Sequence, residues 1–278
     1  MKVILLLQSR LGSSRLPKKN FIPIRKKKEP LVELVLKRIS LAKKIDKVVV
    51  AIPKIKKDDL LYKFLRKKGY SVFRGEETDA LDRFFNAAKK YKADIVVRVT
   101  SDCALIDPKL IDKCVDVFLK KKPDYLSNRF NLDNNIKKYS WAYPDGFDTE
   151  VFSFKLLKYV QRNHKKIHRV EGGVITPFFK QNPKMRKKFV LVGLNSPKLL
   201  KQYPQLSIDT KKDLALVKKI YKHFSPSINF SWTDVVNFLN LEKKEVRENG
   251  QILWRKAKSL ILNGNMLVSK NPEIFLPN

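Results

Sequence analysis

Short apolar runs alternate with amphipathic segments along most of the chain. Three runs are apolar over nearly their whole length, as expected of strands buried on both faces of a sheet: Val3–Leu7, Lys47–Ile52 and Ile95–Val99. Between them, apolar residues recur with helical spacing, for example Val32, Val35, Leu36 and Ile39. This alternation predicts right-handed βαβ units, and hence an α/β fold with a doubly wound, mainly parallel sheet covered by helices on both faces.

Turn and capping residues suggest where the other elements begin and end. Asp58 and Asp59 stand where a helix N-cap is expected, and Gly69 stands where the same helix should end. The apolar residues between them are expected to be buried: Leu60, Leu61, Phe64 and Leu65. Shorter strands are expected at Ser71–Phe73, Tyr125–Asn128 and Phe189–Val192, and further helices at Pro108–Leu119 and Phe230–Leu239.

The first strand is followed abruptly by a polar loop, Gln8–Arg15, which contains hydroxyls, a glycine and two arginines. Gly12 permits a turn and close backbone approach to a ligand, and successive backbone N–H groups can form an anion-binding nest. Arg10 and Arg15 supply forked, charged donors. These features suit a polyphosphate, although an ordinary polar turn has a similar composition. The loop matches neither the P-loop pattern nor the dinucleotide-binding GxGxxG pattern.

Two carboxylates stand beside expected strand ends and helix starts. Asp102 follows the Ile95–Val99 strand, and Asp209 precedes an expected helix. Open parallel sheets bind ligands at the carboxyl ends of their strands, and Mg²⁺ is held by one or two carboxylates together with substrate phosphates and water. Both residues are therefore candidate metal ligands. The alternative is structural: Asp102 would cap the helix that starts near Pro108, or the turn in which it lies, and Asp209 would cap the helix that follows it.

Three more carboxylates, Asp145, Asp148 and Glu150, lie in a turn that is expected to place Gly146 at positive φ and to enter a strand. Carboxylates this close repel one another unless a positive group lies among them. A metal ion, a network of substrate hydroxyls or neighbouring lysines would meet this need. A solvated acidic turn is the alternative.

Composition adds a strong basic bias to this picture. The chain has 278 residues, 43% of them hydrophobic, which is enough for a full core, and a formal net charge of +33. Such a charge favours non-specific binding of nucleic acid at low salt. Basic clusters occur in nearly every segment, however, and no RNA-recognition motif accompanies them. We therefore favour lysines spread over the solvated faces of an enzyme with an anionic substrate.

The sequence contains no sign of export or membrane insertion. No apolar run reaches the roughly 18 residues that a transmembrane helix requires. Gln8 and Arg10 interrupt the apolar N-terminal stretch, so we interpret it as a strand and not as a signal peptide. Cys103 and Cys114 provide neither a disulfide framework nor zinc-ligand spacing, and the three histidines are isolated. The cytoplasm is the simplest compartment.

Four segments, in the same order along the chain, resemble one family. They read QSRLGSSRLPKK (8–19), FRGEETDALDRF (73–84), VVRVTSDCALIDPKLID (96–112) and YPDGFDTEVF (143–152). This combination is similar to the cytidylyltransferase-like family of spore-coat and surface polysaccharide synthesis, which is related to the CMP-sialic acid and CMP-Kdo synthetases. The resemblance implies a Rossmann-like, nucleotide-diphospho-sugar transferase-like fold and a domain of residues 1–240.

The resemblance also implies roles for individual residues. The N-terminal loop would wrap CTP, and three basic side chains would neutralise the triphosphate: Arg10, Arg15 and Lys19. Further contacts with the nucleotide would come from Gln8, Gly12, Ser13, Ser14 and Arg98, although an ion pair within the sheet is an alternative role for Arg98. Mg²⁺ is the implied cofactor, held by Asp102 and Asp209. The acceptor sugar would lie beside Asp145, Asp148 and Glu150.

The chain departs from the family pattern at several of these sites. Lys18 replaces a glycine in the loop, Ala104 replaces a proline after Cys103, and Gln205 takes the place of an arginine near Asp209. Val174 stands where the family has a histidine. Cys103 itself is expected to pack in the core, because no nearby group is placed to activate it as a nucleophile.

Residues 241–278 form a separate segment, with helical spacing from Glu242 to Leu262. Asn263–Glu273 resembles the opening of a glutamate-semialdehyde-type aminotransferase domain, but no aminotransferase activity is expected from so short a piece. The alternative is a C-terminal helix and tail.

Together these features favour a Mg²⁺-dependent nucleotidyltransferase. A hydroxyl of a sugar or sugar acid would attack the α-phosphate of CTP, giving a CMP-sugar and pyrophosphate for surface polysaccharide synthesis. Two alternatives remain: a glycosyltransferase of the same fold, against which the lack of a clear Asp-x-Asp motif argues, and a basic nucleic-acid-binding protein on a degenerate enzyme scaffold. Relatives often dimerise, so a homodimer is one expected assembly.

Overall fold

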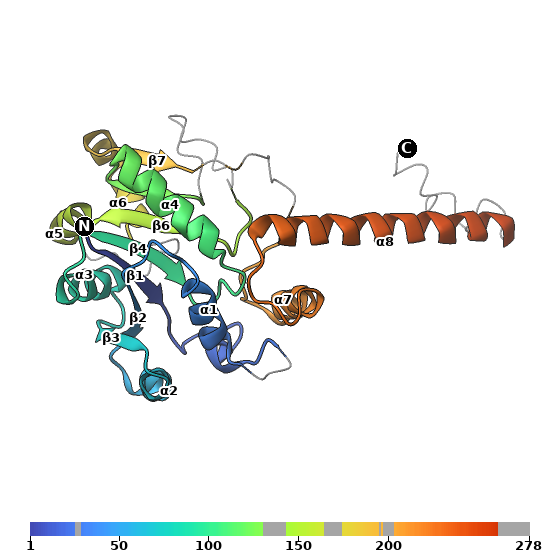
Figure 1. Cartoon of the computed structure of the whole chain (residues 1–278), viewed down its shortest axis with the longest axis horizontal. Helices are drawn as coiled ribbons and strands as arrows, with labels where there is room; N and C mark the ends of the chain where they lie inside the picture. The colour runs from blue at the N-terminus through green and yellow to red at the C-terminus, as the bar shows by residue number, and fades with distance from the viewer. Residues whose placement is uncertain (26–28, 130–142, 164–173, 195, 197–202, 261–278) are drawn as a thin grey trace. The chain divides into compact units, whose positions relative to one another are not determined.

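The computed structural model describes residues 1–25, 29–129, 143–163, 174–194, 196 and 203–260. It comprises two compact units, Met1–Trp232 and Thr233–Asn278, which we describe separately. The first unit is built on a seven-stranded sheet with the order β3-β2-β1-β4-β6-β5-β7 (Figure 1). The strands are β1 (Val3–Gln8), β2 (Lys47–Pro53), β3 (Ser71–Gly75), β4 (Ile95–Thr100), β5 (Tyr125–Ser127), β6 (Glu150–Ser153) and β7 (Leu191–Gly193).

Most neighbouring strands run parallel, which confirms the predicted sheet. β1 pairs in parallel with β2 and β4, β2 with β3, and β5 with β7, whereas β6 runs antiparallel to both β4 and β5. The chain proceeds outward from β1 to β3 and then returns to place β4 on the other side of β1. The carboxyl ends of β1 and β4 therefore flank the point where strand order reverses, which is where open α/β sheets bind ligands.

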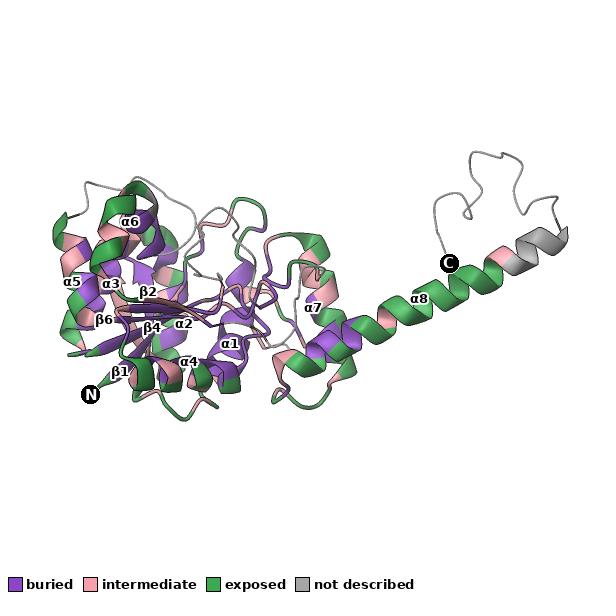
Figure 2. Ribbon diagram, turned by 90° about the horizontal axis from the view of Figure 1, so that it is seen from above, coloured by how far each residue is buried: buried purple, intermediate pink, exposed green. Residues whose placement is uncertain are grey.

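Helices cover both faces of the sheet, as predicted (Figure 2). In one layer α3, α5 and α6 bury apolar side chains against sheet residues that include Ile4, Leu6 and Val96. The opposite layer contains α1 and α4. The helices of this unit are α1 (Leu31–Ile39), α2 (Asp59–Lys67), α3 (Ala80–Lys90), α4 (Pro108–Lys121), α5 (Phe154–Asn163), α6 (Thr176–Gln181) and α7 (Lys211–His223).

The start of α2 differs from the sequence-based expectation. Leu61 and Leu65 are buried as predicted and Gly69 follows the helix at a φ of 80°, but Leu60 is 56% exposed. Asp58 makes no side-chain cap on α2. Its Oδ1 instead accepts a hydrogen bond of 2.6 Å from the backbone N–H of Leu11, in the polar loop after β1. A residue predicted to cap a helix therefore holds the candidate ligand loop in place.

The caps of α4 and α7 show that Asp102 and Asp209 do not serve as helix caps. Asp107 caps α4 by accepting hydrogen bonds from the N–H groups of Lys109 and Leu110. Thr210 caps α7 in a reciprocal capping box with Asp213. The helix-capping alternative for the two candidate metal ligands is therefore wrong, whereas Asp102 does accept a hydrogen bond within its own turn, from the Thr100 hydroxyl. The segment around Asp209 is also not a strand of the sheet.

The second unit contains most of one long helix, α8 (Trp232–Leu260). The closing helix expected at Phe230–Leu239 and the helical spacing from Glu242 onward thus belong to one continuous element. In the part of the chain that the structure describes, no helix is long and apolar enough to cross a membrane. The aminotransferase-like segment lies outside the described residues. So does all but the first residue of the polar stretch Arg129–Ser140, which the sequence predicts to be a loop.

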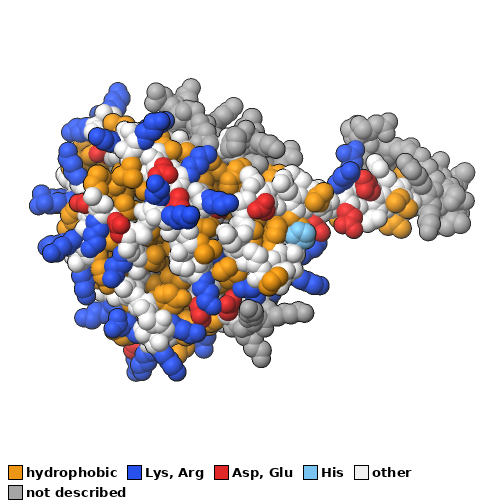
Figure 3. Space-filling model, viewed as in Figure 1, with side chains coloured by type: hydrophobic (Ala, Val, Ile, Leu, Met, Phe, Trp, Pro, Cys, Tyr) orange, Lys and Arg blue, Asp and Glu red, His pale blue; other side chains and the backbone are white. Residues whose placement is uncertain are grey.

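Basic side chains are scattered over the face drawn in Figure 3, where acidic and apolar side chains lie between them. This distribution agrees with lysines spread over solvated faces.

Candidate nucleotide-binding site

A cavity of about 700 Å³ opens at the carboxyl ends of β1 and β4, where Gln8 and Thr100 are paired in the sheet. All predicted nucleotide and metal contacts line it: Gln8, Arg10, Gly12, Ser13, Ser14, Arg15, Lys19, Arg98, Asp102 and Asp209. Asp145 and Asp148 also line the cavity, whereas Glu150 does not and is only 1% exposed. The topology thus brings together residues from four separate sequence segments.

The loop after β1 is held by contacts made from outside it. Asp58 accepts from the N–H of Leu11, and the Asn20 side-chain amide donates to the carbonyl of Arg10. The N–H of Ser13 donates to the Leu11 carbonyl, so the N–H groups of Leu11 and Ser13 are already used inside the protein. The loop can therefore form only part of the expected backbone nest, and its hydroxyls and arginines carry more of any anion contact.

Gly12 is not required by the turn itself. A Cβ at this position would meet only Lys57 Nζ, at 3.8 Å, and the residue does not adopt a positive φ. The expectation that Gly12 serves the turn is therefore wrong, and close approach of a ligand is the remaining physical reason for a glycine.

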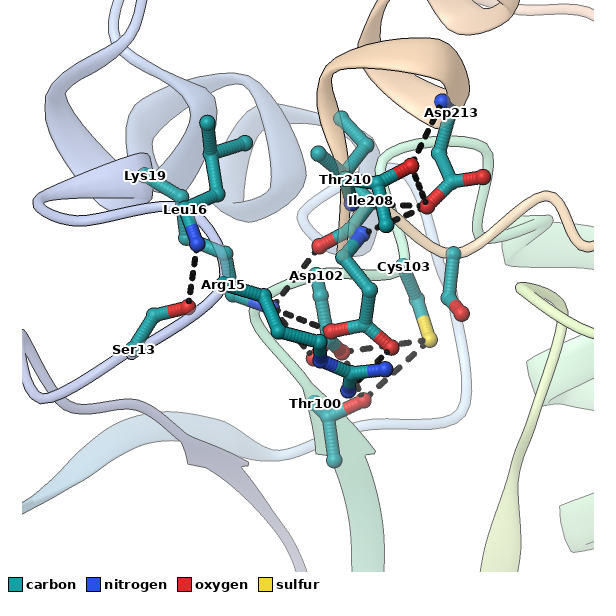
Figure 4. A network of polar contacts seen from close by, with 12 residues as sticks. Ser13, Arg15, Leu16, Lys19, Thr100, Asp102, Cys103, Ile208, Thr210 and Asp213 are labelled. Carbon is teal, nitrogen blue, oxygen red and sulfur yellow. Dashed lines mark hydrogen bonds and ion pairs between the residues drawn. The ribbon is translucent and has the colours of Figure 1, made fainter.

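Lys19 contacts both candidate metal ligands, and Figure 4 shows it in a network of polar contacts with Asp102 and Ile208. Its Nζ donates to Asp102 Oδ2 at 2.9 Å, to Asp209 Oδ1 at 3.0 Å and to the carbonyl of Ile208 at 2.8 Å. Arg15 Nη2 lies 2.9 Å from the other carboxylate oxygen of Asp209. The preceding residue, Lys18, adopts a left-handed φ of 52° at the position where the family pattern has glycine.

Lys19 and Asp102 stabilise each other's charged forms. Burial acts to lower the pKa of Lys19, but the charges and hydrogen bonds of Asp102 and Asp209 outweigh it and raise that pKa. Burial likewise acts to raise the pKa of Asp102, but Lys19 and the Thr100 hydroxyl outweigh it and lower that pKa. Both groups are therefore charged at neutral pH.

The same oxygens fit the needs of a divalent cation. Two carboxylates and a backbone carbonyl converge on one ammonium, so the position already accommodates a cation. Among the residues that the structure describes, no three His, Cys, Asp or Glu side chains form a complete metal cage. An incomplete set of two carboxylates suits Mg²⁺, which keeps water and substrate phosphates among its ligands.

Arg98 is held within the sheet by a buried ion pair. Its Nη1 donates to Glu150 Oε1 on β6, and its Nε donates to the side-chain oxygen of Gln8 at 2.9 Å. The predicted alternative role of Arg98, an ion pair in the sheet, is therefore present. Because Arg98 also lines the cavity, Glu150 contributes by orienting this guanidinium from behind.

The acidic turn is not simply solvated. Asp145 Oδ2 accepts from the Ser207 hydroxyl at 2.8 Å, and Asp148 Oδ2 lies 3.8 Å from Arg129 Nε. Burial raises the pKa of Asp148 to about 8, an effect that Arg129 opposes and that Asp145 and Glu150 increase. The positive groups that the three carboxylates need are the two arginines Arg98 and Arg129.

Gly146 has the predicted positive φ, 97°, and its turn is packed tightly. A Cβ there would lie 2.6 Å from the Leu206 carbonyl carbon and 2.7 Å from the Ser207 nitrogen. The N–H of Leu206 donates to the Asp145 carbonyl at 3.2 Å. The glycine thus lets the acidic turn dock against the segment that leads to Asp209.

Sequence reasoning missed several cavity residues: Arg83, Thr100, Ser101, Arg129 and Ser207. Arg83 lies in the segment 73–84 that resembles the family, on the same helix as buried Leu81 and Phe84, and is 3% exposed. Burial, together with the charge of Arg10, lowers its pKa to about 10. An arginine within an apolar helical pattern was the available signal, and for Arg129 the signal was its position just after a strand.

The other residues that depart from the family pattern, Gln205, Ala104 and Val174, are each held by hydrogen bonds or buried in the core. Gln205 Nε2 donates to Ser207 Oγ at 3.0 Å and to Asp209 Oδ2 at 2.9 Å, so it links the acidic turn to the metal-ligand candidate. The Ala104 carbonyl accepts from the Tyr221 hydroxyl, and Val174 is buried in the core. Cys103 is buried, and this burial raises its pKa well above that of a free thiol, which agrees with packing and not nucleophilic chemistry.

The fold and the cavity together define a class: Rossmann-like nucleotidyltransferases, with a basic loop after the first strand facing carboxylates at the strand-order switch. Comparison with known proteins identifies the group within it. Residues 4–252 match the family described as Cytidylyltransferase, and the chain belongs to that family.

Individual relatives resemble the chain over most of its length. An uncharacterised protein of Methanocaldococcus jannaschii is 36% identical, covering 90% of this chain and 96% of its own length. The spore coat polysaccharide biosynthesis protein SpsF of Bacillus subtilis is 28% identical, covering 86% and 94%. The solved structure of a cytidylyltransferase from Leptospira borgpetersenii is 31% identical, with a TM-score of 0.74 and coverage of 88% and 96%.

Proposed function

We propose that this protein transfers the cytidylyl group of CTP to a hydroxyl of a sugar or sugar acid, and that it requires Mg²⁺. The acceptor oxygen forms a bond to the α-phosphorus, the bond from that phosphorus to the oxygen of the β-phosphate breaks, and pyrophosphate leaves. The product is a CMP-sugar for surface polysaccharide synthesis. Family membership supports the cytidylyl transfer, and the similarity to SpsF supports the biosynthetic setting.

The observation that carries the proposal is the arrangement of charge in the cavity. Arg10, Arg15 and Lys19 lie at the end formed by the loop after β1 and can neutralise a triphosphate. Asp102 and Asp209 would hold Mg²⁺, which supplies positive charge to the phosphates and stabilises the departing pyrophosphate when bound. Catalysis then depends mainly on positioning and charge neutralisation.

The part of the cavity lined by Asp145 and Asp148 is the proposed acceptor site. Asp145 and Asp148 offer carboxyl oxygens to sugar hydroxyls. Because Asp148 already holds a proton, Asp145 is the group placed to take up the proton that the attacking hydroxyl loses. Ser207 orients Asp145, while Arg129 lies beside Asp148. Arg98 also lines the cavity and is oriented by Glu150.

The experiment is thermal stabilisation of the protein by CTP, UTP, ATP and GTP, each with and without Mg²⁺. A ligand at about a hundred times its Kd stabilises by about 2.7 kcal/mol, which is readily measured. We expect a Mg²⁺-dependent shift that is largest for CTP, followed by pyrophosphate release when the right sugar or sugar acid is added. Equal, salt-sensitive shifts with all four nucleotides would contradict the proposal.

A further inference from the structure

The ammonium group of Lys19 occupies the place where the proposed metal should bind. Its three acceptors, Asp102 Oδ2, Asp209 Oδ1 and the Ile208 carbonyl, lie 2.8–3.0 Å away. The side chain is only 10% exposed, so it is enclosed by these partners. An ammonium and a divalent cation cannot share this space, because both need the same carboxylate oxygens.

We infer that Lys19 is a placeholder cation, which leaves Asp102 and Asp209 when the metal–nucleotide complex binds and then contacts the triphosphate. This inference rests on the proposed function and specifies how metal and nucleotide enter the site. Lys19 keeps the two carboxylates together before substrate arrives, and it prevents a metal ion from binding firmly to the free protein.

Charge balance explains the exchange. Lys19 and Arg15 neutralise Asp102 and Asp209, so a divalent cation entering alone would leave an excess of two positive charges. CTP brings the negative charge that removes this excess and gives the ammonium of Lys19 new oxygen partners. Metal and nucleotide therefore bind with positive coupling, each raising the affinity for the other.

The local backbone is compatible with a lysine that moves. Lys19 begins the short 3₁₀ turn Lys19–Phe21, directly after the left-handed Lys18. Its long, flexible stem can redirect the ammonium without disturbing Asn20, whose side chain holds the loop through the Arg10 carbonyl. The exchange therefore requires rotation of one side chain and no refolding of the loop.

The test measures Mn²⁺ binding to the full chain without nucleotide, by the electron paramagnetic resonance signal of free Mn²⁺. Lys19→Met removes the ammonium and keeps a side chain of similar length, so we expect it to bind one Mn²⁺ at least tenfold more tightly than the wild type. Lys18→Met is the matched control, because Lys18 is the neighbouring, exposed lysine. It removes the same charge without vacating the carboxylates, and its Mn²⁺ affinity should equal that of the wild type.

A second variant shows where the gained ion binds. Adding Asp102→Asn to Lys19→Met should abolish the gain, and Mn²⁺ should raise the melting temperature of Lys19→Met but not that of the double variant. The melting temperature still tests the inference if Lys19→Met is less stable than the wild type, because bound Mn²⁺ would then raise the melting temperature of this variant. If Lys19→Met binds Mn²⁺ no more tightly than the wild type, or no more tightly than Lys18→Met, the inference is wrong.

This failure is distinguishable from failure of the proposed function. The Mn²⁺ measurement contains no nucleotide, so it does not depend on whether CTP is the substrate. CTP-selective stabilisation of the wild type together with no gain in Lys19→Met would overturn the placeholder role alone. A gain in Lys19→Met without CTP selectivity would overturn the proposed substrate and leave the placeholder role standing.

Discussion

Gly12 and Gly146 differ in whether the folded structure leaves room for a side chain. A Cβ at Gly12 meets only the end of a lysine side chain, whereas at Gly146 it meets backbone atoms at under 3 Å, at a positive φ. We expect Gly146→Ala to lower the free energy of unfolding by about 2 kcal/mol or more. Gly12→Ala should leave stability nearly unchanged.

Thermal melts of the two alanine variants check this contrast, and nucleotide titration adds a second readout. If Gly12 serves close approach of the phosphates, Gly12→Ala weakens CTP binding while its melting temperature stays near that of the wild type. Equal melting temperatures for Gly146→Ala and the wild type would show that the acidic turn is not locked against Leu206 and Ser207.

Asp148 gives the site a distinctive dependence of stability on pH. Burial raises the pKa of its carboxyl to about 8 in the folded protein, so the folded state retains a proton that the unfolded state has lost above about pH 4. Stability therefore falls as pH rises through this window. Asp148→Asn mimics the protonated form, so its stability relative to the wild type should increase from about pH 4 and level off above pH 8.

Asp102 supplies a control of opposite sign. Because Lys19 and Thr100 lower the pKa of Asp102, its ionised form stabilises the fold above the unfolded pKa, and that stability is lost as pH falls. Asp102→Asn should therefore be less stable than the wild type at pH 7, and the deficit should shrink in acid. Chemical denaturation across the pH range measures both differences; a pH-independent difference for Asp148→Asn would contradict the buried, protonated carboxyl.

Among the elements, α1 is attached to the rest of the first unit through Arg38, which is fully buried. Its guanidinium donates to the backbone carbonyls of Leu105, Ile106, Ile228 and Phe230, and it stacks on the Phe230 ring at 4.1 Å. These contacts connect α1 to the segment after Asp102 and to the approach to α8. Arg38→Met should cost about 3 kcal/mol or more, because it leaves buried carbonyls without donors.

Lys37 is the matched control for Arg38, as the neighbouring basic residue on the same helix. Its ion pairs with Glu29 and Glu33 are partly exposed, so Lys37→Met should cost under about 1 kcal/mol. Denaturant melts of both variants give the comparison. Similar losses would mean that general helix electrostatics, and not the carbonyl contacts of Arg38, hold α1 in place.

The strands and helices that could be predicted from the sequence are those in which the pattern of apolar residues shows which side chains are buried. β1, β2 and β4 are apolar runs in the interior of the sheet. In α1 the apolar residues at helical spacing are buried as predicted, although every residue of this helix except Lys37 is buried. The reversed direction of β6 could not be found, because side-chain alternation is the same in parallel and antiparallel strands. The sequence predicted two separate helical segments where the structure has the single helix α8. The apolar pattern ends near Leu239, and nothing in the sequence pattern shows that the helix continues beyond it.

The carboxylates show the corresponding limit for the site. An aspartate before a helix has the same local pattern whether it caps the helix or faces a cavity, and Asp58, Asp102, Asp107 and Asp209 all qualify. Of these four, only Asp107 proved to be a helix cap. The N-terminal loop was predicted because its arginines, glycine and hydroxyls are contiguous. Arg83 and Arg129 were missed because only the folded chain brings them to the same cavity as that loop.

At the scale of the whole molecule, we expect the net charge of +33 to produce non-specific nucleic-acid binding that does not involve the cavity. Such binding depends on many phosphate contacts, so RNA affinity should fall by about a thousandfold or more when salt rises from about 50 to about 200 mM. CTP engages only a few charges in one cavity, and its Mg²⁺-dependent binding should decline far less over the same range.

Arg15→Ala separates these two kinds of binding. It removes one of 60 basic residues, so RNA affinity should scarcely change, but it also removes a forked donor from the proposed triphosphate site. We expect CTP affinity to fall about tenfold or more, as for loss of one charge-assisted contact. Arg66→Ala, an exposed arginine on α2, removes the same charge outside the cavity and should leave CTP affinity unchanged. If both variants weaken CTP equally, overall charge and not the loop after β1 binds the nucleotide; if only Arg15→Ala does, the loop binds it.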